Sequence, residues 1–164
     1  MTLLDKEPVK RVEKILNNFD SQLKVSVLDT SARTAVEAAS SLGCKVGAIV
    51  KSLLFKTENT FCLCLVAGDK KASLSKIKNI LNKKDIFMAT SDEVKNITGF
   101  SIGGVSPIGH INKVDIFIDN SLERFISLFA AAGHPNCIFE INFKNLQIIT
   151  NGLIKDITEW NNQN

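Results

Sequence analysis

Apolar residues recur at helical spacing along several segments of the chain. The first segment, "EPVKRVEKILNNF" (7–19), places Val9, Val12 and Leu16 on one face and Pro8 near its first turn, which predicts an amphipathic helix. Thr34 and Glu37 have the T-x-x-E spacing of a capping box, which predicts a helix that stops at Gly43. Further helices are predicted over residues 70–84, over 91–97 with Ser91 as the cap and Gly99 as the stop, and over the apolar run 121–133.

Other segments show the alternation or the continuous apolar runs of β-strands. The runs "AIVKSLLF" (48–55) and "TFCLCLVAG" (60–68) flank a short polar turn and predict a hairpin of buried strands. Strands are also predicted over residues 24–28, 86–88, 114–119, 137–141 and 146–150. Because strands and helices mix without strict βαβ alternation, we expect an α+β fold whose mixed, curved, barrel-like sheet is surrounded by helices.

Length and composition set the broad class of protein. The 164 residues suffice for one domain spanning residues 1–164, and 45% apolar with 23% charged residues is ordinary for a globular chain. No apolar run is long enough to span a bilayer, and the first residues lack the uninterrupted apolar core of a signal peptide. We therefore expect a cytoplasmic protein without membrane contact. Four cysteines without C-x-x-C spacing are expected to be reduced core residues (Cys44, Cys62, Cys64 and Cys137).

Positive charge is concentrated in one segment, although the formal net charge is only +3. The segment "KKASLSKIKNILNKK" (70–84) holds six lysines, which is consistent with a surface for an anionic partner. Leu74, Ile77, Ile80 and Leu81 recur within it at core-facing spacing, which favours the solvated face of an ordinary helix.

Several common catalytic motifs are absent. The chain has no phosphate-binding loop, no H-E-x-x-H and no dinucleotide fingerprint. The stretch from Gly104 to Ile108 is not a G-x-S-x-G elbow, since the next glycine comes one residue late and Pro107 opposes the helix that follows an elbow, so Ser106 is not expected to be a nucleophile. Cys62 and Cys64 lie in a continuous apolar run, where cysteine behaves as a small hydrophobe; neither a metal nor a cofactor is expected.

Three features remain as candidates for chemistry. The stretch "TGFSIGGVSPIGH" (98–110) holds Gly103 and Gly104, and consecutive glycines before a proline let backbone N–H groups converge on an anion or a developing oxyanion. Lys51 is a lone lysine within an apolar strand, where burial of an unpaired ammonium is costly, so its side chain is expected at an edge or in a polar cavity. Gly133, His134 and Pro135 stand at the end of the apolar run 121–133. His134 is expected there at the rim of a cavity.

These stretches, taken in order, resemble a known family. "RTAVEAASSLGCKVGAIVKSLLF", "VAGDKKASLSKI", "TGFSIGGVSPIGH" and "VDIFIDNSLERFISLFAAAGHPNCIFEI" are similar to segments of the YbaK/ProX family. That family comprises aminoacyl-tRNA deacylases related to the editing domain of prolyl-tRNA synthetase. The resemblance covers about residues 25–157, and it implies hydrolysis of the ester that joins a wrong amino acid to the terminal ribose of a tRNA, with no cofactor.

The resemblance also implies roles for individual residues. Lys51 matches the family's critical lysine, and Gly103 to Pro107 matches its G-x-x-x-P loop, whose backbone amides hold the ester carbonyl; the catalytic group expected here is Lys51, Gly103 and Gly104. A second group is expected to contact the substrate (Val27, Ser52, Val105, Ser106, Pro107, Gly133 and His134). The apolar part of the pocket is expected to comprise Val25, Val27, Ile49, Ile102 and Val105. The expected partners are tRNA, contacted by Lys70, Lys71, Lys76 and Lys78, and an aminoacyl-tRNA synthetase.

Two other interpretations fit the same residues. One is a non-catalytic tRNA- or synthetase-binding module of the same fold. The other is a small-molecule binding protein that uses the glycine loop to hold a carboxylate or a phosphate. Ser52 follows the critical lysine where alanine-specific family members carry asparagine, so the amino acid that the pocket accepts is left open.

Overall fold

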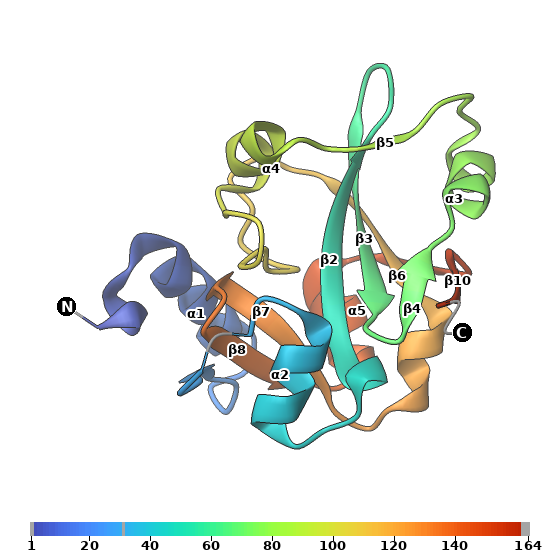
Figure 1. Cartoon of the computed structure of the whole chain (residues 1–164). Helices are drawn as coiled ribbons and strands as arrows, with labels where there is room; N and C mark the ends of the chain where they lie inside the picture. Colours follow the sequence, from blue (N-terminus) through green and yellow to red (C-terminus); the bar gives the residue numbers. More distant parts are fainter. Residues whose placement is uncertain (1, 31, 162–164) are drawn as a thin grey trace.

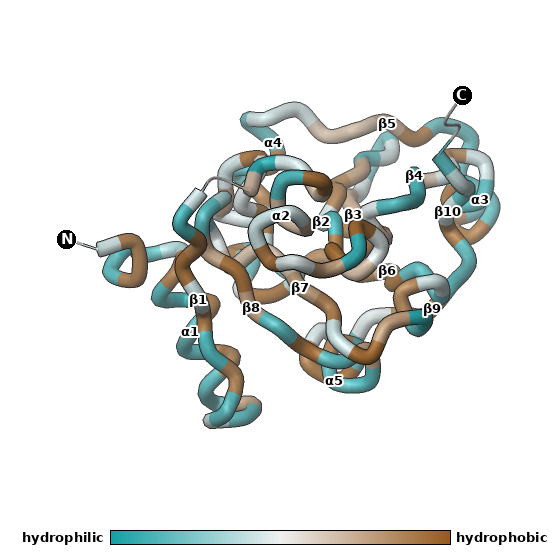
Figure 2. The backbone as a smooth tube through the Cα atoms, turned by 60° about the horizontal axis from the view of Figure 1, so that its bottom comes forward, coloured by the Kyte–Doolittle hydropathy of each residue, from teal (hydrophilic) through white to brown (hydrophobic). Residues whose placement is uncertain are grey.

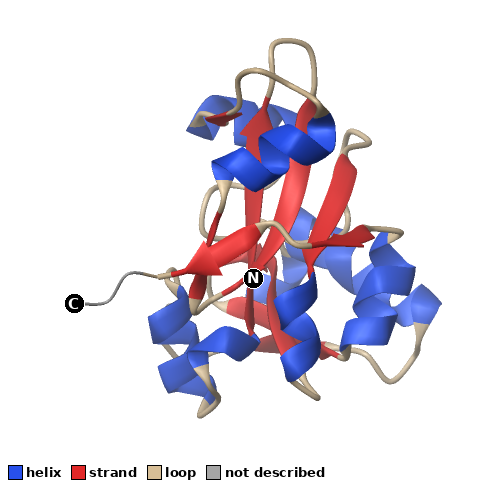
Figure 3. Cartoon of the chain, turned by 90° about the vertical axis from the view of Figure 1, so that its right-hand side faces the viewer, coloured by secondary structure: helices blue, strands red, loops and turns tan. Residues whose placement is uncertain are grey.

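A mixed β-sheet runs through the middle of the protein and helices lie around it (Figures 1 and 3). The computed structural model describes residues 2–30 and 32–161. The main sheet has eight strands in the order β1-β8-β7-β2-β3-β6-β9, with β5 paired to β2, and a second sheet pairs β4 with β10. The strands are β1 (Val25–Val27), β2 (Ile49–Lys56), β3 (Phe61–Ala67), β4 (Lys70–Ala72), β5 (Phe87–Met88), β6 (Asp115–Asp119), β7 (Leu128–His134), β8 (Cys137–Ile141), β9 (Leu153–Lys155) and β10 (Thr158–Trp160).

The sheet is mixed, as the sequence predicts, but it is not closed into a barrel. The predicted hairpin is present, with β2 antiparallel to β3 over its whole length. The pairs β2–β7, β3–β6 and β6–β9 are parallel, and the remaining pairs of the main sheet are antiparallel. Among the described residues, β1 and β9 stand at the two ends of the strand order without pairing to each other.

The helices begin and end at the residues expected from capping chemistry. The Thr34 side chain accepts a hydrogen bond from the Glu37 N–H, and Gly43 ends that helix with φ of 67°. Thr90, rather than the predicted Ser91, caps the helix that stops at Gly99, because Thr90 and Glu93 form a reciprocal capping box. The α-helices are α1 (Glu7–Phe19), α2 (Ala35–Leu42), α3 (Leu74–Leu81), α4 (Ser91–Thr98) and α5 (Phe143–Thr150), and short 3₁₀ turns are η1 (Leu3–Asp5), η2 (Val46–Ala48) and η3 (Asn120–Arg124).

The core lies between the sheet and the apolar faces of these helices. Val9, Val12 and Leu16 of α1 are fully buried in the main cluster, and α1 packs against β7. Ile77 of α3 packs on the other side of the β2–β3 hairpin, in a cluster that includes Phe55, Cys62 and Cys64. Figure 2 shows that hydrophobic segments, coloured brown, run along β7 and β8. Glu140 is the exposed position of β8. No helix among residues 2–30 and 32–161 has the length and apolarity that crossing a membrane requires.

The predicted helix over residues 121–133 is wrong. Residues 120–124 form the 3₁₀ turn η3, and residues 128–134 form strand β7, in which buried and partly buried residues alternate from Leu128 to Ala132. The alanines favour a helix locally, but pairing with β2 on one side and β8 on the other overrides that preference. Ile126, which a helix would have placed in its apolar stripe, is 92% exposed.

The predicted strand over residues 146–150 is also wrong, since these residues are the second half of α5. The Asn142 side chain accepts from the Asn145 N–H at 2.8 Å, and Asn151 ends the helix in the left-handed region with φ of 53°. Both are ordinary helix boundary signals. The β-branched run Ile148 to Thr150 had suggested a strand, but Leu146 is the position that the helix buries.

Candidate active site

A cavity of about 370 Å³ lies where the edge of β2 has no neighbouring strand. On this side β2 pairs with β7 only at Ile49 and Val50, and with β5 only at Phe55 and Lys56. The stretch between them, residues 51–54, therefore borders the cavity with its backbone edge as well as its side chains. This explains why both Lys51 and Ser52 line the cavity although successive strand residues point to opposite faces.

Six of the residues singled out in the sequence line this cavity (Lys51, Ser52, Gly103, Val105, Ile49 and Ile102). The rest of the wall is mostly apolar, from α2, β7 and the residues around β5. Chain segments separated by half of the sequence thus meet at one place. Their catalytic and binding roles remain predictions.

The other expected pocket residues lie elsewhere in the described structure. Val25 and Val27 belong to β1, which β8 and β7 separate from β2, and neither residue lines this cavity. Ser106 and Pro107 are buried behind the loop, and the Ser106 hydroxyl accepts from the Ile108 N–H at 3.3 Å. A second, more open hollow is lined by the remaining three residues (Gly104, Gly133 and His134).

Lys51 combines partial burial with a single hydrogen bond to the backbone. Its Nζ donates to the carbonyl oxygen of Lys70 at 2.5 Å. Burial lowers the pKa of Lys51 below the usual lysine value, and the nearby Asp69 carboxylate partly offsets this. The Asp69 charge is shared, because its carboxylate accepts two hydrogen bonds from Arg124 at 2.8 and 2.9 Å. Among the described residues, Lys51 thus borders the cavity without an ion pair to a carboxylate of its own.

Ser52 lines the cavity, but its hydroxyl oxygen is buried. This oxygen has no hydrogen-bond partner among the described residues. A buried hydroxyl without a partner costs free energy, of the order of 1–3 kcal/mol.

The glycine loop crosses the cavity as a tight turn. The Gly104 N–H donates to the Ser101 carbonyl at 3.0 Å, and Gly103 has φ of 96°, which is the geometry of a turn that favours glycine at its third position. The Gly104 N–H is thus already used inside the loop. Within the described residues the N–H groups of Gly103 and Val105 have no partner, and both residues line the cavity.

Gly104 is required for a different reason from the one expected. A Cβ placed on it would lie 2.9 Å from the backbone N and Cα of His134. Gly133 in turn leaves room for the start of α1, since a Cβ there would lie 2.9 Å from the Pro8 carbonyl. The loop, the β7–β8 hairpin and α1 therefore stack backbone against backbone, so that His134 lies behind the cavity wall and not at its rim.

The base of the loop is held by side chains outside the cavity. Arg11 of α1 donates to the Gly109 carbonyl at 2.5 Å and lies over the Phe100 ring. His110 Nε2 donates to the Ser106 carbonyl at 2.7 Å, because a carbonyl oxygen can only accept. Burial lowers the pKa of His110, which favours its neutral form. These contacts fix the turn before any ligand enters.

The lysines of the basic segment divide into paired and unpaired groups. Lys70 and Lys71 lie in β4 and not in the predicted helix, and Lys71 pairs with Glu159 at 3.3 Å. Lys76 of α3 pairs with Asp156 at 2.9 Å and also donates to the Thr158 carbonyl. Lys78 and Lys84 have no carboxylate partner among the described residues.

The sequence reasoning missed one charged residue at the cavity. Arg33, exposed and just before α2, is part of the lining. Its place follows from the packing of α2 against β2, which no local pattern around Arg33 reveals. Among the described residues no group of three or more His, Cys, Asp or Glu side chains is arranged to hold a metal ion.

Comparison with known proteins identifies the class to which this fold and cavity belong. The profile of the aminoacyl-tRNA editing domain matches residues 29–148. A crystal structure of a proposed trans-editing enzyme for prolyl-tRNA synthetase superposes with a TM-score of 0.88 at 36% identity, over 94% of this chain and 98% of the other. The protein YwhH of Bacillus subtilis, whose function is uncharacterized, is 32% identical over 84% of this chain and 88% of its own length.

Proline–tRNA ligases contain a similar segment. That of Caldicellulosiruptor bescii is 27% identical over 90% of this chain, which spans only 26% of the ligase. The chain thus corresponds to about a quarter of such ligases. It belongs to the aminoacyl-tRNA editing domain family, and its structural neighbours are YbaK-like.

Proposed function

We propose that this protein is a trans-editing hydrolase of the cytoplasm that deacylates mischarged aminoacyl-tRNA. The observation that carries the proposal is that Lys51, Gly103 and Val105 line one mostly apolar cavity, while the N–H groups of Gly103 and Val105 have no partner among the described residues. Membership of the editing-domain family supports the same reaction. The tRNA is the partner that the substrate requires, and the similarity to ligase segments supports a synthetase as a second partner.

The reaction needs little beyond positioning and charge stabilisation. Water adds to the ester carbonyl carbon, the carbonyl oxygen becomes an oxyanion, and the bond to the ribose oxygen then breaks, with the proton passing to that oxygen. In the proposed mechanism the N–H groups of Gly103 and Val105 donate to the oxyanion, and Lys51 supplies a positive charge beside it. The fixed turn provides these donors without reorganisation during the reaction.

The cavity lining supports selection by size. Apolar residues from three elements narrow it, including Ile49, Val105 and Ala130. An apolar wall separates substrates by only about 1–3 kcal/mol per methylene, so we expect a preference for Ala, Ser, Cys or Thr esters that is broad but excludes Phe and Tyr. Ser52 lines the cavity as well, and its contact with the substrate belongs to the proposal. Arg33 is also part of the cavity lining and contributes a guanidinium group. The apolar wall therefore does not by itself exclude esters of amino acids with acidic side chains.

The test is the initial hydrolysis rate on a panel of aminoacyl-tRNAs at equal concentration, in the presence of a chelator. We expect measurable deacylation of at least one small amino acid ester and much slower hydrolysis of Phe and Tyr esters. Preference for an aromatic ester would contradict the proposed pocket, and the absence of hydrolysis across the panel would contradict the proposed function. Val105→Ala, which enlarges the cavity, should raise the hydrolysis rate of larger esters relative to that of small ones.

A further inference from the structure

The chain exposes its single tryptophan between two cations. Trp160 ends β10, lies opposite Lys70 of β4 in the antiparallel pair, and is 59% exposed. Lys70 Nζ lies 4.5 Å and Arg124 Cζ 5.2 Å from the centre of its ring. An exposed aromatic ring beside two positive charges suits a ligand that has both a flat π-system and an anionic group.

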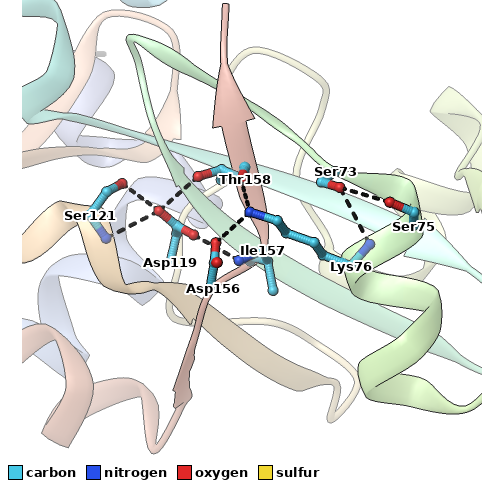
Figure 4. A network of polar contacts seen from close by, with 8 residues as sticks. All are labelled: Ser73, Ser75, Lys76, Asp119, Ser121, Asp156, Ile157 and Thr158. Carbon is cyan, nitrogen blue, oxygen red and sulfur yellow. Dashed lines mark hydrogen bonds and ion pairs between the residues drawn. The ribbon is translucent and has the colours of Figure 1, made fainter.

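The ring is held in place by a buried polar network. The Asp119 carboxylate accepts from the Ile157 N–H at 2.9 Å and from the Thr158 hydroxyl at 3.0 Å, and it also accepts from the N–H and hydroxyl of Ser121 (Figure 4). Lys76 of α3 holds the same segment through Asp156 and the Thr158 carbonyl. The strand that carries Trp160 is therefore fixed from two sides.

Arg124 is fixed as well. Its guanidinium makes two hydrogen bonds to Asp69 and donates a third to the Ser121 carbonyl at 2.7 Å. It also lies over the Phe125 ring. A planar guanidinium and an indole ring that are both held before binding lose little conformational freedom when a ligand stacks on them.

This group of residues is connected directly to the proposed reaction centre. The backbone carbonyl of Lys70 accepts the hydrogen bond from Lys51, so the residue that contacts Trp160 also positions Lys51. Trp160 lies outside residues 29–148, the part that matches the family profile. Lys70 and Arg124 lie within the matched region, so Trp160 is the one member of the cluster that lies beyond it.

We propose that Trp160, Lys70 and Arg124 form a binding site for an unpaired nucleotide of RNA. The base stacks on the exposed indole and guanidinium planes, and the Lys70 ammonium faces the phosphate. Resting on the proposed function, this nucleotide belongs to the single-stranded acceptor end of the tRNA whose ester enters the cavity. Stacking of this kind tolerates any base, since every base has a π-face.

The chain itself offers a direct readout of this site. It has one tryptophan and no tyrosine, so its tryptophan fluorescence reports on Trp160 alone. We expect a short single-stranded RNA to quench this fluorescence saturably, and a blunt RNA duplex of equal charge to quench it much less. No quenching by either RNA, or equal quenching by both, would overturn the stacking site. This measurement requires no hydrolysis, so its outcome is independent of the proposed function.

Variants connect the site to turnover. Trp160→Leu should raise KM for aminoacyl-tRNA by about 10-fold with kcat little changed, and Trp160→Phe should retain most of the affinity. Phe87→Leu is the matched control, because Phe87 is 57% exposed without a cation against its ring in the described structure, and it should leave KM unchanged. Hydrolysis with a KM that Trp160→Leu does not alter would refute the site and leave the proposed function standing.

Discussion

The ammonium group of Lys51 donates a hydrogen bond to the backbone carbonyl of Lys70 at 2.5 Å. This contact joins the open edge of β2 to β4, two segments that are not neighbours in the main sheet. It fixes the end of the Lys51 side chain, and Lys51 itself lines the cavity. Among the described residues, the Lys70 carbonyl is the one hydrogen-bond partner of this amine.

A comparison of Gly103 with Gly43 separates the role of the glycine loop in catalysis from its contribution to protein stability. Gly103 and Gly43 both have positive φ, and a Cβ at either position meets no atom closer than 3.5 Å. Replacement of either glycine by alanine should destabilise the protein by about 1–2 kcal/mol, because alanine is strained in the left-handed backbone conformation. We expect only Gly103→Ala to lower the deacylation rate markedly, as measured beside thermal unfolding. Equal activity of the two variants would show that the turn is only structural.

His110 should make stability depend on pH in the weakly acidic range. Its pKa is lowered in the folded state, mainly by burial, so the unfolded chain takes up the proton first. The contribution of neutral His110 to the stability of the folded protein is complete above about pH 6.5, which is the pKa of histidine in the unfolded chain. This contribution is lost as the pH falls through that value toward the lower pKa of the folded state. His134 also has a lowered pKa and adds in the same direction.

Chemical denaturation at several pH values between 5 and 7.5 (about one unit either side of the unfolded value) tests this dependence. His110→Gln keeps a donor for the Ser106 carbonyl and removes the titration. We expect the variant to lose less stability than wild type between neutral and weakly acidic pH. A pH dependence as steep as that of wild type would assign the effect to other groups.

The sequence predicts most of the fold where local signals and tertiary packing agree. The α1 stripe and the β2–β3 hairpin were both confirmed, since their apolar periodicity is also their burial pattern. The strand β7 was missed because Phe129 to Ala132 favour a helix locally, and only pairing with distant strands decides otherwise. Gly103 and Lys51 could be connected with one cavity only through the family resemblance, because part of the wall (Phe129, Ala130 and Ala131) comes from the missed strand.

The lysines of the basic segment should differ in their contribution to RNA binding. Lys78 and Lys84 lack carboxylate partners among residues 2–30 and 32–161, whereas Asp156 already neutralises Lys76. If the unpaired lysines contact phosphates, replacing both with Gln should weaken tRNA binding and reduce the salt dependence of log K by about 0.7–0.9 for each contact. Binding titrations at several salt concentrations measure this slope. A slope equal to that of wild type would place the tRNA elsewhere.

Lys51 provides the most direct test of the proposed active site, through the single-turnover rate of Lys51→Met beside wild type on a small mischarged aminoacyl-tRNA. Methionine keeps the apolar stem and removes the charge, and the half-buried lysine has a lowered pKa, so the variant should unfold within about 1 kcal/mol of wild type. We predict a rate at least about 100-fold lower, as loss of an oxyanion-stabilising group produces. A folded Lys51→Met protein that deacylates at the wild-type rate would contradict the assignment of Lys51 and of the cavity as the active site.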